Sequence, residues 1–295
     1  MRSEPYTVAT PALNAKTANN VTRVRQIVNW REERVEDGAI IFENPFVALR
    51  IQKWLHDPKA TEAGKEILRW MTSLQRPQQY QSYQSVLLLD AKGIVRLSVP
   101  EGERTLDPFS KTLAIETVKN KKVILSDLYQ EEPSNVIRLS LLVPILIQRG
   151  GSPFRVAVIL LRIDPQQFLY PLIQLWPTPS RTSETLLIRR EGEEVIFLNE
   201  LRHLENTALA LRFPMSRQQL PAAMATLGHE GIAEGFDYRG VPVLAAARKI
   251  PGSPWFLVAK VDQDEIYAPI RMETRLIAAL VGALVIGAAV SAGFL

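Results

Sequence analysis

Two stretches of the chain decide the fold: VLLLDAKG at Val86–Gly93 and TLLIRREG at Thr185–Gly192. Each is an apolar run that ends in a short polar turn closed by glycine, and a second apolar run follows, IVRLSV in the first case and EVIFLNEL in the second. Apolar runs on both sides of such a turn predict a β-hairpin. The two closing glycines stand 99 positions apart, so the pattern indicates that one structural unit occurs twice.

Other short stretches recur in the same order at nearly the same distance: VPIL at 143–146 as VPVL at 241–244, and GSPF at 151–154 as GSPW at 252–255. The last predicted strand of each copy ends in an aspartate, Asp164 or Asp262. An aspartate at that place is a favourable N-cap for a following helix. Each unit is therefore expected to contain a hairpin, a helix, two or three long strands and a final helix.

The helices of the units are expected at DPFSKTLAIETVKNKK, which begins with Asp107 and Pro108 as cap and first turn, and at SRQQLPAAMATLG, which Gly228 ends. Strand runs such as SLLVPIL and VAVILL are apolar on both alternating faces. Both faces of each sheet should then be covered, by helices on one side and by further helix or a ligand cavity on the other. The fold class predicted is α/β (α+β), with antiparallel sheets.

Helix-forming sequence precedes the first unit, from about Val21 to Ser73, with breaks near Pro45 and Pro58. The chain ends on LIAALVGALVIGAAVSAGFL, Leu276–Leu295, in which no side chain is charged. Twenty helical residues span roughly 30 Å, the thickness of the hydrocarbon core of a bilayer. This end is therefore predicted to be a transmembrane helix, whereas the N-terminus has no apolar segment of the signal-peptide kind.

Composition excludes several classes of function. A chain of 295 residues with 46% apolar residues can bury one large or two ordinary cores. The net charge is only +4 and the basic residues are spread along the chain, so nucleic acid is not an expected partner. Cysteine is absent, which excludes disulfides and thiolate metal sites.

Sequence motifs for catalysis are also absent. The chain contains no His-Glu-x-x-His, Gly-x-Ser-x-Gly or Walker motif, so we expect no enzyme and no cofactor. Its three histidines, His56, His203 and His229, are scattered, and no metal site is expected. A hydrolase of the secreted type is disfavoured because the nucleophile motifs are absent.

Taken together, a helical stalk, two PAS-like units and a membrane helix resemble the double Cache (dCache) sensory module of bacterial transmembrane receptors. The stretches Leu160–His203 and Glu234–Tyr267 look like the sensor regions of PAS-containing histidine kinases. The resemblance implies an extracytoplasmic sensor of a small molecule, with its pocket in the membrane-distal unit and an output domain after the second membrane span. Receptors of this type usually work as dimers, so a homodimer in the inner (cell) membrane is expected, with the lipid bilayer as a further partner.

On this resemblance the chain is expected to divide at these boundaries: 1–20 as a disordered N-terminal segment, 21–78 as the helical stalk, 79–175 as the membrane-distal Cache/PAS-like unit, 176–270 as the membrane-proximal unit, and 271–295 as the transmembrane helix. A first membrane span and an output domain are missing, so we expect a piece of a longer receptor. The Arg-x-Trp-Tyr stretch of amino-acid-binding dCache sensors is also missing, which makes amino acids a less expected ligand.

The geometry of the family implies that ligand-facing groups come from the second strand of the first hairpin, the segment after the helix, and the strand that leads to VPIL. The polar residues at those places are Arg96, Ser98, Asp127, Tyr129, Arg138 and Ser140. Arginine could pair with an anionic group and aspartate could receive an ammonium, so a small anionic or zwitterionic ligand is expected. The alternative for each residue is plain exposure at the end of a strand.

The sequence therefore favours the sensor half of a two-component histidine kinase, whose ligand shifts an equilibrium between two arrangements by about 1–3 kcal/mol and so moves the membrane helix. Two alternatives stay open. One is the sensor module of a diguanylate cyclase or chemoreceptor. The other is a tail-anchored structural or scaffolding protein, with the C-terminal helix as its anchor.

Overall fold

The computed structural model describes residues 6–75, 83–149, 152–174 and 180–268, together with Ile277, residues 280–284 and Gly287. The chain divides into two compact units. We call Arg25–Leu172 the first unit, and Met1–Val24 with Ile173–Leu295 the second unit. The predicted helical stalk, 21–78, falls partly in each of the two units, and the predicted domain boundaries stay predictions.

Helix α1, Tyr6–Phe42, begins inside the segment 1–20 that the sequence predicts to be disordered, so helix replaces the predicted disorder from Tyr6 onward. Contacts within the second unit explain the difference. The side chain of Asn20 donates a hydrogen bond of 2.7 Å to the carbonyl of Ala246, and Arg23 donates one of 2.6 Å to the hydroxyl of Thr185. Such tertiary contacts can fix a helix that local sequence alone would leave unformed.

Two shorter helices follow in the first unit, α2 at Pro45–His56 and α3 at Thr61–Gln75. The break before α2 falls near Pro45, as predicted. Asn44 is the N-cap of α2, because its side-chain oxygen accepts hydrogen bonds from the amides of Phe46 and Val47 at 3.1 and 3.2 Å.

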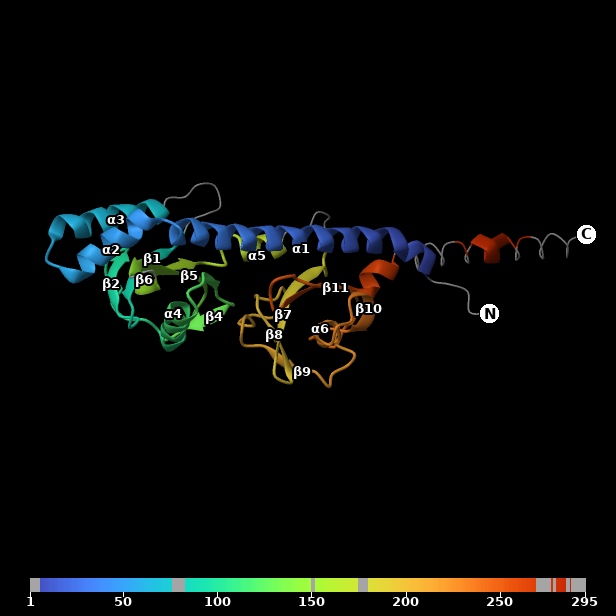
Figure 1. The fold of residues 1–295 in the computed structure, drawn as a ribbon. Coiled ribbons are helices and arrows are strands. Elements are labelled where there is room, and N and C mark those ends of the chain that lie inside the picture. Colours follow the sequence, from blue (N-terminus) through green and yellow to red (C-terminus); the bar gives the residue numbers. More distant parts are fainter. Residues whose placement is uncertain are drawn as a thin grey trace, which may run out of the picture. The chain divides into compact units, whose positions relative to one another are not determined.

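The first unit contains one antiparallel sheet. Its strands are β1 (Ser85–Asp90), β2 (Val95–Val99), β3 (Ile124–Leu125), β4 (Tyr129–Glu131), β5 (Val136–Arg149) and β6 (Ser152–Ile163). The strand order is β2-β1-β6-β5-β3, and β4 pairs with β5 (Figure 1). The two predicted strands of the hairpin are β1 and β2, and the long central strands are β5 and β6.

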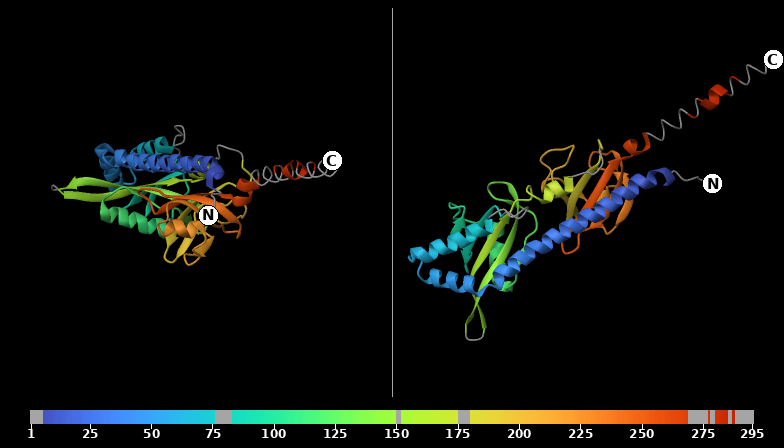
Figure 2. Two further views of the ribbon diagram at one scale, coloured as in Figure 1. Left: turned by 90° about the vertical axis from the view of Figure 1, so that its right-hand side faces the viewer. Right: turned by 90° about the horizontal axis from the view of Figure 1, so that it is seen from above.

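Helices cover both faces of this sheet. Helices α2 and α3 lie on one face and α4, Pro108–Asn120, lies on the other (Figure 2). Helix α4 begins as predicted: Asp107 is the N-cap and accepts a 3.0 Å hydrogen bond from the amide of Ser110. Beneath α4 the apolar core gathers Leu87, Leu89, Ala114, Val118, Leu142, Val158 and Leu160. The sheet is therefore buried on both faces, as the apolar runs of its strands indicated.

The second unit contains a second antiparallel sheet. Its strands are β7 (Glu184–Glu191), β8 (Glu194–Phe197), β9 (Arg212–Pro214), β10 (Gly231–Phe236), β11 (Pro242–Lys249) and β12 (Trp255–Asp262), in the order β10-β11-β12-β7-β8-β9. The helix preceding the sheet in sequence is α5, Leu169–Gln174, and the one packed on it is α6, Pro221–Thr226. Helix α6 is shorter than the predicted segment 216–228, because the residues before Pro221 form turns.

The two sheets share one topology. In each, the first strand of the hairpin lies between the second strand and the last long strand: β2-β1-β6-β5 in the first unit and β8-β7-β12-β11 in the second. This correspondence matches the repeat in the sequence, since β1 and β7 carry the two stretches that open the hairpins. The shared topology thus supports a duplicated α+β unit.

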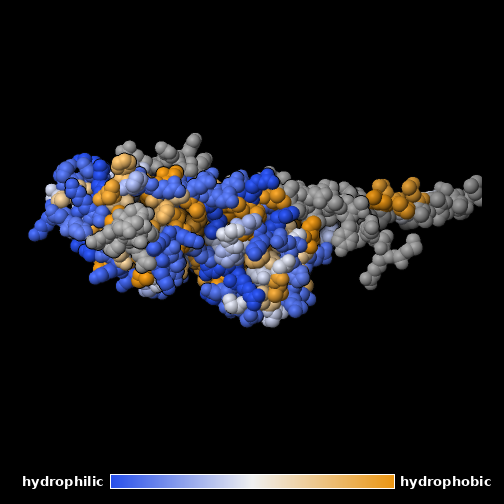
Figure 3. Space-filling view, viewed as in Figure 1, coloured by the Kyte–Doolittle hydropathy of each residue, from blue (hydrophilic) through white to orange (hydrophobic). Residues whose placement is uncertain are grey.

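Most of the predicted membrane span, 271–295, lies outside the described residues. Ile277, residues 280–284 and Gly287 are described, and all of them are helical. Their apolar side chains include Leu280 and Leu284, which are 63% and 73% exposed. Figure 3 shows hydrophobic surface on this described part of the helix. Within the described part of the chain, no helix has both the length and the apolar character needed to cross a membrane.

Candidate functional site

A buried arginine marks the candidate site of the first unit. Arg162 stands near the end of β6, between Ser85 of β1 and Ser140 of β5. Side chains alternate along a strand, so Arg162 shares its face with Leu160, which packs beneath α4. The residue is only 4% exposed, and a buried guanidinium must be compensated by nearby acceptors.

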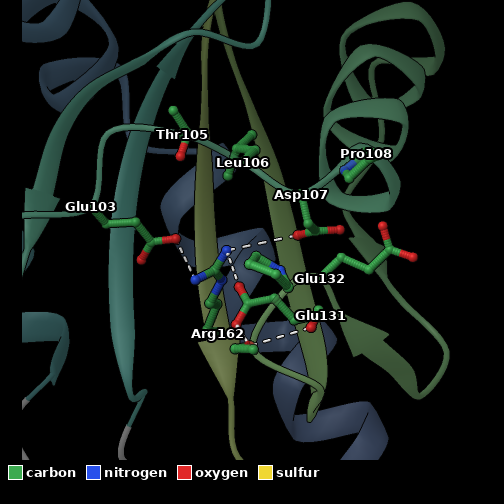
Figure 4. Close-up of a pocket in the computed structure, with 10 residues that line it drawn as sticks. Glu103, Thr105, Leu106, Asp107, Pro108, Glu131, Glu132 and Arg162 are labelled. Carbon is green, nitrogen blue, oxygen red and sulfur yellow. Dashed lines mark hydrogen bonds and ion pairs between the residues drawn. The ribbon is translucent and has the colours of Figure 1, made fainter.

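Three carboxylates surround this guanidinium (Figure 4). One terminal nitrogen of Arg162 forms an ion pair with Glu103, which belongs to the loop after β2. The other terminal nitrogen lies 2.6 Å from Oε1 of Glu131 on β4 and 3.9 Å from Oδ2 of Asp107 at the start of α4. The sheet, the loop and the helix terminus thus converge on one cation.

Glu131 joins a second arginine to the cluster. Its Oε2 accepts a 2.7 Å hydrogen bond from Nε of Arg138 on β5, and a 3.1 Å hydrogen bond from the hydroxyl of Ser134. Oε1 of the same carboxylate is taken by Arg162. A single carboxylate therefore bridges two arginines that stand on neighbouring long strands.

Asp107, unlike Glu131, accepts a hydrogen bond at only one of its two carboxylate oxygens. Its Oδ1 caps α4, but Oδ2 is buried and accepts no hydrogen bond from the described part of the chain. The Nε of Arg162 is likewise buried without a hydrogen-bond acceptor among the described residues. Buried polar atoms are almost always hydrogen-bonded, so unpaired ones at a pocket are candidates for contact with a ligand or water.

A pocket of about 530 Å³ opens at this cluster. It lies between the loop after β2, the start of α4 and the turn from β4 to β5. The residues that line it are Glu103, Thr105, Leu106, Asp107, Pro108, Glu131, Glu132, Pro133, Ser134 and Arg162. A pocket of this size, with a few converging polar groups, can hold a small organic molecule.

Protonation at the pocket follows from its charges. Burial raises the pKa of Glu103; the positive charge of Arg162 opposes this rise, and the negative charge of Glu131 adds to it. Glu103 thus feels both the compensating arginine and the crowding of carboxylates. Burial also raises the pKa of the Tyr129 hydroxyl, which therefore stays neutral at ordinary pH.

Two predicted site residues, Tyr129 and Ser140, lie beside the pocket rather than in its lining. The hydroxyl of Tyr129 is 2.8 Å from that of Ser140 and 3.0 Å from that of Ser110 on α4. The Tyr129 ring packs on Phe109, with ring centroids 4.5 Å apart. These contacts hold the start of α4 against the sheet, which fixes the position of Asp107.

The other predicted residues have different surroundings. Arg138 belongs to the cluster through Glu131. Arg96 forms an exposed ion pair of 2.6 Å with Asp90 of its own hairpin and does not line the pocket. Ser98 is buried on β2 opposite Leu87, also outside the lining.

Asp127 is not among the residues that line the pocket, and its Oδ1 accepts a 2.7 Å hydrogen bond from the amide of Leu128. Burial lowers the pKa of Arg31 in helix α1, while the charge of Asp127 acts in the opposite direction. Helix α1 packs on the face opposite to α4, because a Cβ at Gly38 would touch Leu141 and Val143.

Four residues of the cluster were not anticipated: Glu103, Asp107, Glu131 and Arg162. The sequence predicts Asp107 as the N-cap of a helix, and this role alone accounts for an aspartate at that position. The signal for Arg162 is its place in the run VAVILLRI, where a charged side chain falls on an apolar strand that must be buried on both faces. Such a residue needs acidic partners that are also buried, and the sequence does not indicate which acidic residues these are.

The second unit has its own buried charges. Lys260 is 1% exposed, and its ammonium lies 2.9 Å from Glu184 and 2.8 Å from Asp237. Tyr238 donates a 2.9 Å hydrogen bond to Glu184, and Arg239 pairs with Asp237 and Asp262. Because every ammonium and carboxylate in this network has partners, we assign it to the stability of the second unit. No group of His, Cys, Asp or Glu suited to a metal ion occurs in the described part of the chain.

Comparison with known proteins identifies one family over most of the chain. The family model described as "Cache domain" matches residues 13–270. Curated proteins gave no match.

Several solved structures share the fold at low sequence identity. The ligand-binding domain of the Campylobacter jejuni chemoreceptor Tlp3, in complex with L-norvaline, has a TM-score of 0.62 and 14% identity, and the match covers 90% of this chain and 97% of that one. The corresponding domain of the Pseudomonas aeruginosa amino acid chemoreceptor PctB, in complex with L-Arg, has a TM-score of 0.56 and 17% identity, with 87% and 97% covered. The ligand-binding domain of Mlp24 with asparagine has a TM-score of 0.57 and 13% identity, with 90% and 99% covered.

Proposed function

Since the chain belongs to the Cache domain family and is built as a double Cache sensor module, we propose that the pocket at Arg162 is the ligand site of an extracytoplasmic receptor. Modules of this kind bind ligands and are not catalytic. The output of binding is then a change of conformation, not a chemical product.

The observation that carries the proposal is the pocket itself. It has the volume of a small organic molecule, and it lies where a loop, a helix terminus and a β-turn meet over a buried arginine. A ligand that contacts all three would bias their arrangement, because it favours whichever arrangement it binds better. A purely structural cluster would not need an open pocket at which Oδ2 of Asp107 and Nε of Arg162 are buried without a hydrogen bond from the described residues.

For the type of receptor, we favour a chemoreceptor at least as strongly as a histidine kinase. The similar solved structures are ligand-binding domains of chemoreceptors, and the ligands in their descriptions are amino acids. These likenesses support a small-molecule ligand for this chain. A tail-anchored scaffold remains less supported, because it gives the pocket no role.

Membrane attachment and dimerisation are parts of the same proposal. The uncharged C-terminal stretch has the length of a membrane span. Its described members support this reading, since Ile277, Leu280 and Leu284 expose apolar side chains on a helix. The module would stand outside the inner membrane, with the first unit distal to it, and would act as a homodimer.

The experiment that tests the proposal is a calorimetric titration of the purified chain with a library of small metabolites. We expect at least one binder, whose affinity falls in Glu103→Gln and Glu132→Gln, because both side chains line the pocket. Glu191→Gln, a half-exposed carboxylate of the second unit, is the matched control and should leave binding unchanged. Absence of any binder, or binding that neither pocket variant weakens, would refute the assignment of the site.

A further inference from the structure

We propose that Tyr238 is a built-in ligand of the second unit: its side chain fills the site that corresponds to the pocket at Arg162, so the second unit takes no small molecule of its own. The function proposed above concerns the first unit alone, and the two are tested separately. Three features of the two units lead to this proposal: a buried cation, the carboxylate that bridges it to a second cation, and the residue that follows this carboxylate.

Each unit buries a cation at the same place on its last long strand. Arg162 on β6 pairs with Ser85, the first residue of β1. Lys260 on β12 pairs with Glu184, the first residue of β7. The two cations are almost fully buried, and they stand 98 positions apart, which is also the offset between VPIL and VPVL. The duplication therefore places Arg162 and Lys260 at one position of the shared fold.

The bridging carboxylate is also repeated. In the first unit Glu131, in the strand before β5, bridges Arg162 and an arginine of β5. In the second unit Asp237 stands in the turn before β11. Its Oδ2 lies 2.8 Å from Nζ of Lys260 and 2.7 Å from Nε of Arg239. Since β5 and β11 carry VPIL and VPVL, the two bridging carboxylates come from corresponding segments of the repeat.

The residues after these two carboxylates differ. In the first unit residues 132–134 follow Glu131 and line the open pocket (Figure 4). In the second unit Tyr238 follows Asp237 directly, and its ring packs against the apolar core that includes α6. The centre of this ring lies 5.0 Å from Nζ of Lys260, a distance at which a ring attracts a cation. An aromatic ring thus lies beside the buried cation of the second unit, whereas a pocket opens at that of the first.

The hydroxyl of Tyr238 completes the contacts of the second site. It donates a 2.9 Å hydrogen bond to Oε2 of Glu184, an oxygen that also lies 2.9 Å from Nζ of Lys260. The other oxygen, Oε1, accepts a 2.5 Å hydrogen bond from the amide of Arg202. Burial and the negative charge of Glu184 raise the pKa of Tyr238, so its hydroxyl keeps the proton that it donates.

The two sites consequently differ in what is left unpaired. In the second unit Tyr238 and Lys260 both contact Glu184, whose two oxygens are occupied. In the first unit Nε of Arg162 is buried and has no hydrogen-bond acceptor among the described residues. A buried polar group without a partner is a candidate for contact with a ligand or water, and a fully paired one is not. Tyr238 therefore supplies the aromatic and hydrogen-bonding groups that a small molecule would otherwise bring.

The test removes this side chain and supplies it again as a free molecule. Tyr238→Ala should open a cavity beside Lys260 and Glu184, and p-cresol has the structure of the lost side chain. We expect millimolar p-cresol to raise the thermal unfolding midpoint of the purified Tyr238→Ala chain by about 2–4 °C, in a concentration-dependent manner. The wild-type chain and Tyr238→Phe are the matched controls, and their midpoints should not rise because both keep the ring.

Toluene, which lacks the hydroxyl, distinguishes a ligand site from an ordinary core cavity. It cannot donate to Glu184, so it should stabilise Tyr238→Ala less than p-cresol does. Equal effects of the two compounds, no effect of p-cresol, or the same rise in the wild-type chain would overturn the proposal. If Tyr238→Ala does not fold, recovery of the folded chain by p-cresol supports the proposal, and failure to recover it contradicts the proposal. None of these outcomes bears on the pocket at Arg162, which the metabolite titration tests.

Discussion

Oε1 of Glu131 lies 2.6 Å from a terminal nitrogen of Arg162, and this pair is the centre of the candidate site. Both side chains are at most 10% exposed, so neither charge is compensated by bulk water. Glu131 stands on β4 and Arg162 on β6, which are not neighbours in the sheet. Their pairing therefore fixes the turn after β4 over the central strands, and a change at either residue should be felt by the whole pocket.

Replacing the arginine should destabilise the first unit strongly. Arg162→Met leaves Glu131 with Arg138 alone and removes the cation that faces the buried carboxylate of Asp107, and such a loss typically costs about 3–5 kcal/mol in the free energy of unfolding. The matched control Arg96→Met removes an exposed arginine from its pair with Asp90, which is worth about 0–1 kcal/mol. Denaturant unfolding of both variants measures the difference, and equal losses would contradict the burial argument.

The hydroxyl contacts of Tyr129 should act as one group. Tyr129→Phe removes the hydroxyl that lies between Ser110 and Ser140, and we expect a loss of about 1 kcal/mol in the free energy of unfolding. Ser140→Ala removes one end of the same contact. Because the two residues share a hydrogen bond, the double variant should lose less than the sum of the single losses. Strict additivity in a double-mutant cycle would show that this contact does not form.

The buried lysine of the second unit gives a parallel prediction. Lys260→Met leaves Glu184 and Asp237 without their shared ammonium, so a loss of about 3–5 kcal/mol is expected. Lys249→Met, on the neighbouring strand β11, changes an exposed lysine and should be nearly neutral. The measurement is again denaturant unfolding. A small loss for Lys260→Met would mean that the network is solvated or rearranges.

Glu265 makes part of the stability depend on pH. Burial opposes its ionisation, but hydrogen bonds from the hydroxyls of Ser180 and Thr182 and from the amides of Thr182 and Arg181 outweigh it and hold its pKa at about 2. The ordinary value is 4.5, so the charged form stabilises the fold above pH 4.5 and this contribution is lost as the pH falls toward 2.

Glu265→Gln should accordingly lower stability at neutral pH and reduce the fall in stability between pH 4.5 and pH 2. Thermal unfolding across this range measures both effects. Glu193→Gln is the control, because the Glu193 side chain is 87% exposed. The argument would be wrong if the two variants had the same pH dependence.

Much of the fold could be predicted because its signals are local. Each hairpin follows from a polar turn that is closed by Gly93 or Gly192 and lies between two apolar runs. Helix α4 begins at Asp107 and Pro108 because these two residues favour a helix start without any contact from distant parts of the chain. The beginning of helix α1, in contrast, could not be predicted from local sequence. Its first turns belong to a helix that contacts Ala246 and Thr185, far along the chain, and such contacts leave no mark in the local sequence.

The candidate site was predicted only in part, for a related reason. Tyr129, Arg138 and Ser140 were predicted because they stand at polar positions on strands of apolar character; Arg138 pairs with Glu131, and the other two lie beside the pocket. Glu103 lies in a loop, where an acidic residue is ordinary, and only the fold brings it to Arg162. Arg96 and Asp127 satisfied the same sequence criteria as the others, but neither lines the pocket: Arg96 pairs with Asp90, and Asp127 accepts a hydrogen bond from the amide of Leu128.

Hydrogen exchange of the chain with and without the tightest-binding compound of the library tests the central claim most directly. If the pocket at Arg162 is the ligand site, the compound should slow exchange in residues 103–110 and 131–134, which surround it. Slower exchange confined to the second unit, for example in β10 to β12, would contradict the account.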